Sequence, residues 1–178
     1  MKFERVTKYP DAILPQRATI GSAGYDFCAA ETIRIYPHTI ELIPTGIKCK
    51  LCSNSWLMLA LRSSTPRKKN LMLANGIGII DSDYYNNPDN EGHIMFQVYN
   101  FSDTLVVVEK GERIGQGVIL PYETVYDDVA VGERTGGFGS TSNDLPEQMV
   151  IEAVTHGPAP DGTEVYRQIS DMVMRSNL

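Results

Sequence analysis

The chain has 178 residues, and its 42% hydrophobic and 21% charged residues are the proportions of a globular domain with a real core, not of a disordered protein. Sixteen Lys and Arg against 22 Asp and Glu give a net charge of −6, which argues against a broad surface for nucleic acid or for an anionic membrane. Residues 1–11 lack the apolar run of a signal peptide and no stretch reaches transmembrane length, so we expect a cytoplasmic protein.

Short strand-like runs, separated by turn residues, fill roughly the first 130 residues of the chain. Several alternate polar with apolar side chains, and Gly, Pro, Asn or Asp stand between them. The clearest runs are residues 32–36, 40–43, 56–61, 93–100, 105–108 and 114–120. No amphipathic helix is expected before residue 140. The pattern predicts an all-β fold, a β-sandwich or barrel-like jelly roll.

Two stretches interrupt this pattern. Residues 85–92 are too polar and too rich in turn formers for a strand, which predicts a loop. Near the end of the chain, a helix over 163–175 is predicted because apolar residues recur there at helical spacing: Val165, Ile169, Met172 and Val173. We therefore expect a β domain over 1–142, whose glycine-rich arm covers about 131–142, and an extension over 143–178.

The cysteines are not expected to bind a metal. Cys49 and Cys52 have the spacing of a ligand pair, but no second Cys or His pair completes a four-ligand zinc site. Ordinary reduced thiols are the simpler interpretation for these two residues and for Cys28.

The glycine-rich segment 136–141 is the first candidate for ligand binding. Glycines let backbone N–H groups approach an anion closely, and its end adds further donors from Gly139, Ser140 and Thr141. Arg134, just upstream, can form a fork to a phosphate, while the ring of Phe138 has little local core to join and is placed to cover a ligand. A flexible linker with one anchoring residue is the alternative, because short glycine motifs are permissive.

Arg62, Ser63 and Ser64 form a second candidate, directly after an apolar run, where a strand ends. A guanidinium and two hydroxyls suit a polyanion. A capped turn with a surface arginine is the competing interpretation.

Residues 75–84 predict a β-hairpin, since Asn75-Gly76 is the strongest two-residue turn signal. The main-chain groups at its tip can pair with the edge of a nucleobase. Asp81 follows two apolar residues, so we expect partial desolvation, as a general base requires. Asp83 alternates to the other face and is interpreted as solvating the hairpin.

Taken in order, five segments resemble the five motifs of the trimeric dUTPase family, over about residues 18–142. They are residues 23–27, 62–66, 75–84, 111–117 and 134–141. Each motif alone is permissive, but five in this order and at suitable spacing are specific. The resemblance implies a jelly-roll-like fold, a homotrimer, and three active sites to which neighbouring subunits contribute.

The resemblance also implies roles for the nucleoside end of dUTP. Asp81 corresponds to the base that activates water for attack on the α-phosphorus. Tyr84 corresponds to the ring that packs on the deoxyribose and leaves no space for a 2′-hydroxyl. Asn75 and the backbone after it, including Gly78, correspond to the uracil-binding segment, with Phe138 stacked over the base.

For the triphosphate, the resemblance implies a second set of residues. The phosphate chain is held by Arg62, Ser63, Ser64 and Gln116, and the arm closes on the γ-phosphate with Arg134, Ser140 and Thr141. Asp26 corresponds to an acidic residue near the network of metal-bound water. In this family Mg²⁺ is held by the triphosphate and water, so no direct protein ligand is expected.

The chain departs from the family pattern in four places. Arg134 lies one residue nearer to Phe138 than is usual, and Ser142 stands where a final glycine is common. Residues 86–91 look like an insertion, and the chain continues past Ser142 to Leu178. The insertion and the extension are candidate surfaces for a regulatory protein partner, as in a phage-type dUTPase.

A related enzyme, dCTP deaminase, is the nearest alternative because it shares the fold and an Arg-Ser-Ser element. That branch is expected to carry Trp at the place of Tyr84 and a catalytic Glu at the place of Gln97. An amide cannot shuttle the proton that deamination requires, which favours the dUTPase interpretation.

Overall fold

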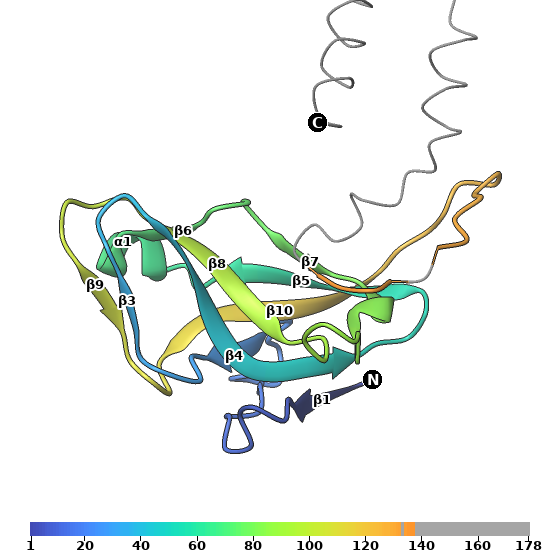
Figure 1. Cartoon of the computed structure of the whole chain (residues 1–178), viewed down its shortest axis with the longest axis horizontal. Helices are drawn as coiled ribbons and strands as arrows, with labels where there is room; N and C mark the ends of the chain where they lie inside the picture. The colour runs from blue at the N-terminus through green and yellow to red at the C-terminus, as the bar shows by residue number, and fades with distance from the viewer. Residues whose placement is uncertain (133, 138–178) are drawn as a thin grey trace, which may run out of the picture. The chain divides into compact units, whose positions relative to one another are not determined.

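The computed structural model describes residues 1–132 and 134–137, which form a nearly all-β domain (Figure 1). Its strands are β1 (Lys2–Arg5), β2 (Tyr25–Cys28), β3 (Ile33–Ile35), β4 (Ile40–Lys50), β5 (Ser55–Leu61), β6 (Leu71–Leu73), β7 (Gly78–Ile80), β8 (Ile94–Asn100), β9 (Val106–Val108) and β10 (Arg113–Pro121). Two short helical turns complete it, α1 (Thr65–Lys69) and the 3-10 turn η1 (Ser82–Tyr84).

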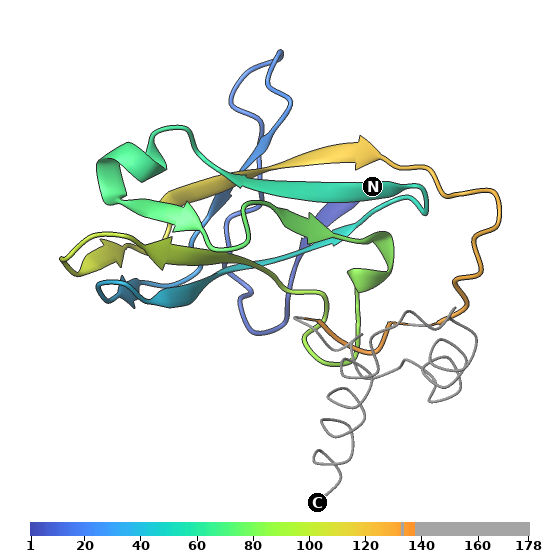
Figure 2. The same ribbon diagram turned by 90° about the horizontal axis from the view of Figure 1, so that it is seen from above.

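The strands form two four-stranded sheets and a small two-stranded ribbon. The first sheet has the order β1-β4-β8-β6 and the second β2-β10-β5-β7, and β3 pairs with β9. All these pairs are antiparallel. The two sheets lie one over the other (Figures 1 and 2). The predicted β-sandwich is thus confirmed.

The core lies between the two sheets, and β8 shows how the sequence builds it. Alternate residues of β8 are buried, beginning with Ile94 and Phe96, because successive side chains of a strand point to opposite faces. The Phe96 ring lies 5.8 Å from the ring of Phe27 in the other sheet. A Cβ on Gly115 would lie only 2.2 Å from the Phe96 ring, so a glycine is needed there for the sheets to approach. Burying each phenylalanine contributes roughly 2–3 kcal/mol.

The predicted strand runs and the loop over 85–92 are confirmed, with β4 longer than expected. It continues past Pro44 because its pairing with β8 shifts between Pro44 and Ile47, and a β-bulge tolerates a proline that a regular ladder would not.

The short helix α1 lies before residue 140, but none of its residues is buried, so it does not contradict the expectation of no amphipathic helix there. Its five residues are too few to show a helical period. A proline in the first turn and Asn70 in the left-handed conformation begin and end it. In the described residues no helix is long and apolar enough to cross a membrane. The helix expected over 163–175 lies outside the described residues, and the boundary at residue 142 stays a prediction.

Candidate functional site

The segment predicted as a β-hairpin is a turn that crosses from one sheet to the other, so that prediction is wrong. Before the turn, β6 pairs only with β8, and after it β7 pairs only with β5. Gly76 forms the turn at a φ of 76°, and its N–H donates to the Leu73 carbonyl at 3.2 Å. The Asn-Gly signal predicted this turn correctly. It does not encode which strands pair afterwards, because that depends on which sheet edges are free.

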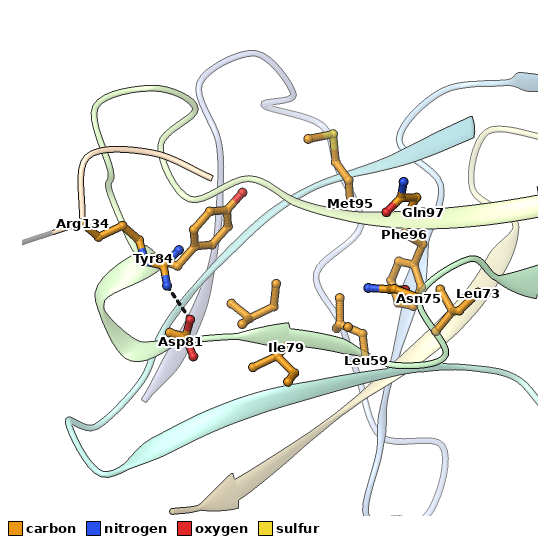
Figure 3. Close-up of a pocket in the computed structure, with 12 residues that line it drawn as sticks. Leu59, Leu73, Asn75, Ile79, Asp81, Tyr84, Met95, Phe96, Gln97 and Arg134 are labelled. Atoms are coloured by element: carbon orange, nitrogen blue, oxygen red, sulfur yellow. Dashed lines mark hydrogen bonds and ion pairs between the residues drawn. The ribbon is translucent and has the colours of Figure 1, made fainter. Parts of the chain in front are cut away.

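A cavity of about 380 Å³ lies where this crossing turn separates the edges of the two sheets. Figure 3 shows Asp81, Tyr84 and Arg134 at one end of it and Asn75 with Gln97 at the other. Apolar side chains from both sheets form its walls, among them Leu59, Leu73, Ile79, Met95 and Phe96. Five predicted site residues therefore meet in one cavity: Asn75, Gly78, Asp81, Tyr84 and Arg134. We call it the crossing-turn pocket.

Arg134 links the two carboxylates that follow β7. Its Nη2 donates to Asp81 Oδ2, and its Nε donates to Asp83 Oδ1 at 2.8 Å. The Asp83 side chain is 57% exposed, in line with its interpretation as a solvating residue, and its carboxylate also pairs with the arm. The Asp81 side chain is 47% exposed, so it is partly buried, in line with the partial desolvation expected from the sequence. Its nearest charged partner is the Arg134 guanidinium.

Tyr84 forms one wall of the pocket and is only 6% exposed. The Arg134 guanidinium carbon lies 5.7 Å from the centre of its ring. A Cβ on Gly137 would lie 2.8 Å from the ring edge, so the glycine lets the arm backbone pass close to Tyr84.

A second pocket, of about 340 Å³, gathers the predicted phosphate-binding side chains and is called the phosphate pocket below. Its predicted members come from three neighbouring strands or their ends: Asp26, Arg62, Ser63 and Gln116. A Cβ on Gly24 would lie 2.4 Å from Gln116 Oε1, so the glycine makes room for that amide. Ser64 precedes α1 and lies outside the pocket lining.

Asp26 bridges two arginines beside the phosphate pocket. Its Oδ2 accepts from Arg113 Nη1 at 3.1 Å, and its Oδ1 lies 3.9 Å from Arg62 Nε. Sequence reasoning did not single out Arg113. Arg113 lies opposite Cys28 on the adjacent antiparallel strand, and this position can be known only from the register of β2 and β10.

The two pockets lie at opposite ends of β5. Ile80, just before Asp81, pairs with Leu57, whereas Arg62 follows the last residue of β5. At ~3.3 Å per residue, Leu57 and Arg62 are about 16 Å apart along the strand. No described residue lines both pockets. The remaining predicted residues, Phe138, Gly139, Ser140 and Thr141, lie outside the described part of the chain.

His93 is a buried residue just before β8 whose importance sequence reasoning missed. Its Nε2 accepts from the Gly46 N–H at 2.8 Å, and burial lowers the pKa of His93 to about 4. The imidazole is therefore neutral near pH 7. The backbone carbonyl oxygen of His93 accepts from the Tyr84 hydroxyl at 3.0 Å, which connects His93 to the crossing-turn pocket.

Comparison with known proteins places the chain in a family. A family model described as dUTPase matches residues 10–142. The deoxyuridine 5′-triphosphate nucleotidohydrolase of Lactococcus lactis is 54% identical over 143 residues, which cover 78% of this chain and 95% of the relative.

Solved structures agree with this assignment. The crystal structure of dUTPase from Streptococcus mutans is 48% identical, with a TM-score of 0.69, and covers 70% of this chain and 98% of that one. A mutant dUTPase from phage phi11 of S. aureus, described with a structural Mg(II) ion, shares the fold at 20% identity and a TM-score of 0.59, covering 75% of this chain and 98% of that one. By its family model, its relatives and its fold, this chain belongs to the dUTPase family.

Proposed function

We propose that this chain hydrolyses dUTP to dUMP and pyrophosphate, with Mg²⁺ bound to the triphosphate. Membership of the dUTPase family and 54% identity to a named deoxyuridine 5′-triphosphate nucleotidohydrolase support this reaction. The observation that carries the assignment of residues is the crossing-turn pocket. It gathers a carboxylate, an arginine, a tyrosine ring and a polar turn in one cavity of about 380 Å³.

Asp81 is the proposed general base. It accepts a proton from a water molecule as the water oxygen bonds to the α-phosphorus. The bond from the α-phosphorus to the bridging oxygen breaks, and that oxygen leaves with pyrophosphate. Arg134 donates to Asp81 Oδ2, and we propose that it leaves this carboxylate when the substrate binds. The γ-phosphate is its proposed new partner, since guanidinium groups bind phosphate by two parallel hydrogen bonds.

Specificity for a deoxyuridine nucleotide is proposed to come from the rest of the same pocket. Asn75 and the backbone from Gly78 pair with the uracil edge, at the end of the cavity away from Asp81 (Figure 3). Tyr84 supplies the wall that excludes a 2′-hydroxyl. Phe138 is proposed to stack on the base, an interaction worth about 1–3 kcal/mol in comparable cases.

The separation of the two pockets supports sites shared between subunits. A phosphate chain leaving Asp81 cannot also follow β5 for about 16 Å to reach Arg62 of the same chain. We propose a homotrimer in which Arg62, Ser63, Ser64 and Gln116 of one subunit serve the crossing-turn pocket of another. Most soluble homo-oligomers have closed symmetry, which would give such a trimer three equivalent sites.

The residues of the chain fit a Mg²⁺ ion held mainly by the substrate. Mg²⁺ keeps several waters and is usually bound by one or two carboxylates and the substrate phosphates. The described residues contain no cluster of three His, Cys, Asp or Glu side chains that could hold a metal. The Asp26 carboxylate, already paired with Arg62 and Arg113, is suited to contact the ion through water. When bound, the ion neutralises part of the phosphate charge.

Two alternatives were open from the sequence. Deamination of dCTP is disfavoured, because Gln97 lines the crossing-turn pocket where that enzyme is expected to carry Glu. An amide cannot shuttle the proton that the reaction requires. A regulatory protein partner stays a prediction. One of its two candidate surfaces, residues 86–91, is a folded loop, and the other lies outside the described residues.

Pyrophosphate release from dUTP, UTP, dTTP and dCTP, assayed side by side with Mg²⁺, tests the proposed function. We expect rapid release from dUTP alone. Equal turnover of UTP would contradict the role given to Tyr84, and ammonia release from dCTP would support the deaminase alternative.

A further inference from the structure

The loop over 86–92 folds around the side chain of Asn87, which is only 5% exposed. Its Oδ1 accepts from two backbone N–H groups of the loop, each at 3.1 Å. Its Nδ2 donates to the Tyr84 carbonyl and to Asn90 Oδ1, both at 2.9 Å. Gly92 has a φ of 78°, and a Cβ there would lie 2.5 Å from the Tyr84 carbonyl oxygen. The loop is therefore packed directly against Tyr84.

The hydrogen bonds around Asn90 determine which way its amide points. Its Oδ1 accepts from Asn87 Nδ2 and from the Gly92 N–H, at 2.9 and 3.0 Å, so this atom must be the oxygen. Its Nδ2 then donates to the Tyr84 hydroxyl at 2.9 Å. The hydroxyl proton goes to the His93 carbonyl at 3.0 Å. Burial raises the pKa of Tyr84, which keeps that proton in place at neutral pH.

The far side of the loop is anchored to the first sheet. The Glu91 carboxylate accepts from the Thr7 N–H at 3.2 Å and from Lys48 Nζ at 3.3 Å. The same Lys48 Nζ donates to Asn86 Oδ1 at 2.6 Å. Asn90 is thus held by a framework that does not depend on the substrate, and it can resist displacement of the Tyr84 hydroxyl.

We propose that Asn90 is a positioning residue for sugar discrimination, and that it acts through the Tyr84 hydroxyl. A steric wall excludes a larger group only as far as the wall resists being pushed aside. The Tyr84 ring is fixed at its backbone end by η1 and at its hydroxyl end by Asn90 and the His93 carbonyl. This inference rests on the proposed function, in which the ring excludes the 2′-hydroxyl of UTP.

Replacing Asn90 by Ala tests it. We expect the preference for dUTP over UTP, measured as the ratio of kcat/KM values, to fall about three- to tenfold, the range of one lost hydrogen bond. Most of the change should be a gain with UTP. Asp89→Ala is the matched control, because Asp89 is an exposed neighbour with no side-chain hydrogen bond among the described residues, and its ratio should not change. An unchanged ratio for Asn90→Ala would overturn the proposal.

A second set of variants separates positioning from general damage to the loop. Tyr84→Phe leaves the loop intact but removes the hydroxyl, so it should lower the ratio by a similar factor. In that background Asn90→Ala should add little, whereas effects that multiply would show that Asn90 acts elsewhere.

Tyr84→Ala tests the proposed function beneath the inference. If it lowers the ratio while Asn90→Ala and Tyr84→Phe do not, the inference alone fails. If it leaves the ratio unchanged, the role of Tyr84 and the inference fail together.

Discussion

The crossing-turn pocket and the phosphate pocket are built from the same sandwich in opposite ways. In the crossing-turn pocket, Arg134 reaches Asp81 across 53 residues of chain, so a cation from the arm covers a fixed carboxylate. In the phosphate pocket, Asp26 lies between two arginines carried on or next to strands. In the proposed mechanism, one pocket thus depends on an arm that moves and the other on side chains carried by neighbouring strands. We therefore expect substrate binding to reorganise the first pocket more than the second.

The largest expected effect comes from removing the proposed base, Asp81. Asp81→Asn keeps the size and polarity of the side chain but loses its basicity, so kcat should fall at least ~10²–10⁴-fold while dUTP affinity is nearly intact. Steady-state kinetics and calorimetric titration with dUTP measure the two quantities. High activity in Asp81→Asn, with an inactive Asp83→Asn, would show that the wrong carboxylate was assigned.

Mixed trimers test whether the two pockets work together across subunits. Asp81→Asn chains and Arg62→Ala chains should each be inactive alone, but co-expression should restore about a quarter of native activity, since random assembly leaves that share of sites intact. Light scattering should give about three times the 19.8 kDa chain. Co-expression of Asp81→Asn with Asp81→Ala is the control and should stay inactive. A monomer, or no recovery in verified mixed trimers, would refute the shared site.

His93, which contacts Tyr84 of the crossing-turn pocket, allows a test by the pH dependence of stability. In the unfolded chain His93 gains a proton near pH 6.5, but in the folded chain only near pH 4. The stability that neutral His93 contributes is therefore complete above pH 6.5 and is lost as the pH falls toward 4. The loss should reach roughly 3 kcal/mol. Urea denaturation of the native protein and of His93→Gln, from pH 7 to 4, measures it by difference. Parallel stability profiles would contradict the buried neutral imidazole.

The smallest expected effect is at Asp83. Its carboxylate is more than half exposed, so its pair with Arg134 should contribute less than about 1 kcal/mol. Asp83→Asn should therefore change dUTP kcat/KM by less than about fivefold. The kcat/KM of the variant should also depend less on salt concentration than that of the native protein. A loss as large as that of Asp81→Asn would mean that Asp83 takes part in the chemistry.

The sequence was sufficient for features that depend on local pattern. Alternation predicted the strands of the sandwich, and the apolar run before Arg62 correctly placed this residue at a strand end. The Asn75-Gly76 turn was also correct, but the partner of the strand after it was not, because pairing depends on distant sheet edges. The contacts of Asp83 with Arg134 and of Arg113 with Asp26 join residues far apart in the chain, and no local signal encodes them.

Phe96 belongs at once to the hydrophobic core and to the lining of the crossing-turn pocket. The ring that packs on Phe27 and against Gly115 is also the floor beneath the proposed uracil position. If uracil binds as proposed, one side chain serves both folding stability and base selectivity, and we expect that the two cannot be tuned independently. A cavity made at Phe27, which packs on that ring, would leave the Phe96 ring less firmly held beneath the proposed uracil position.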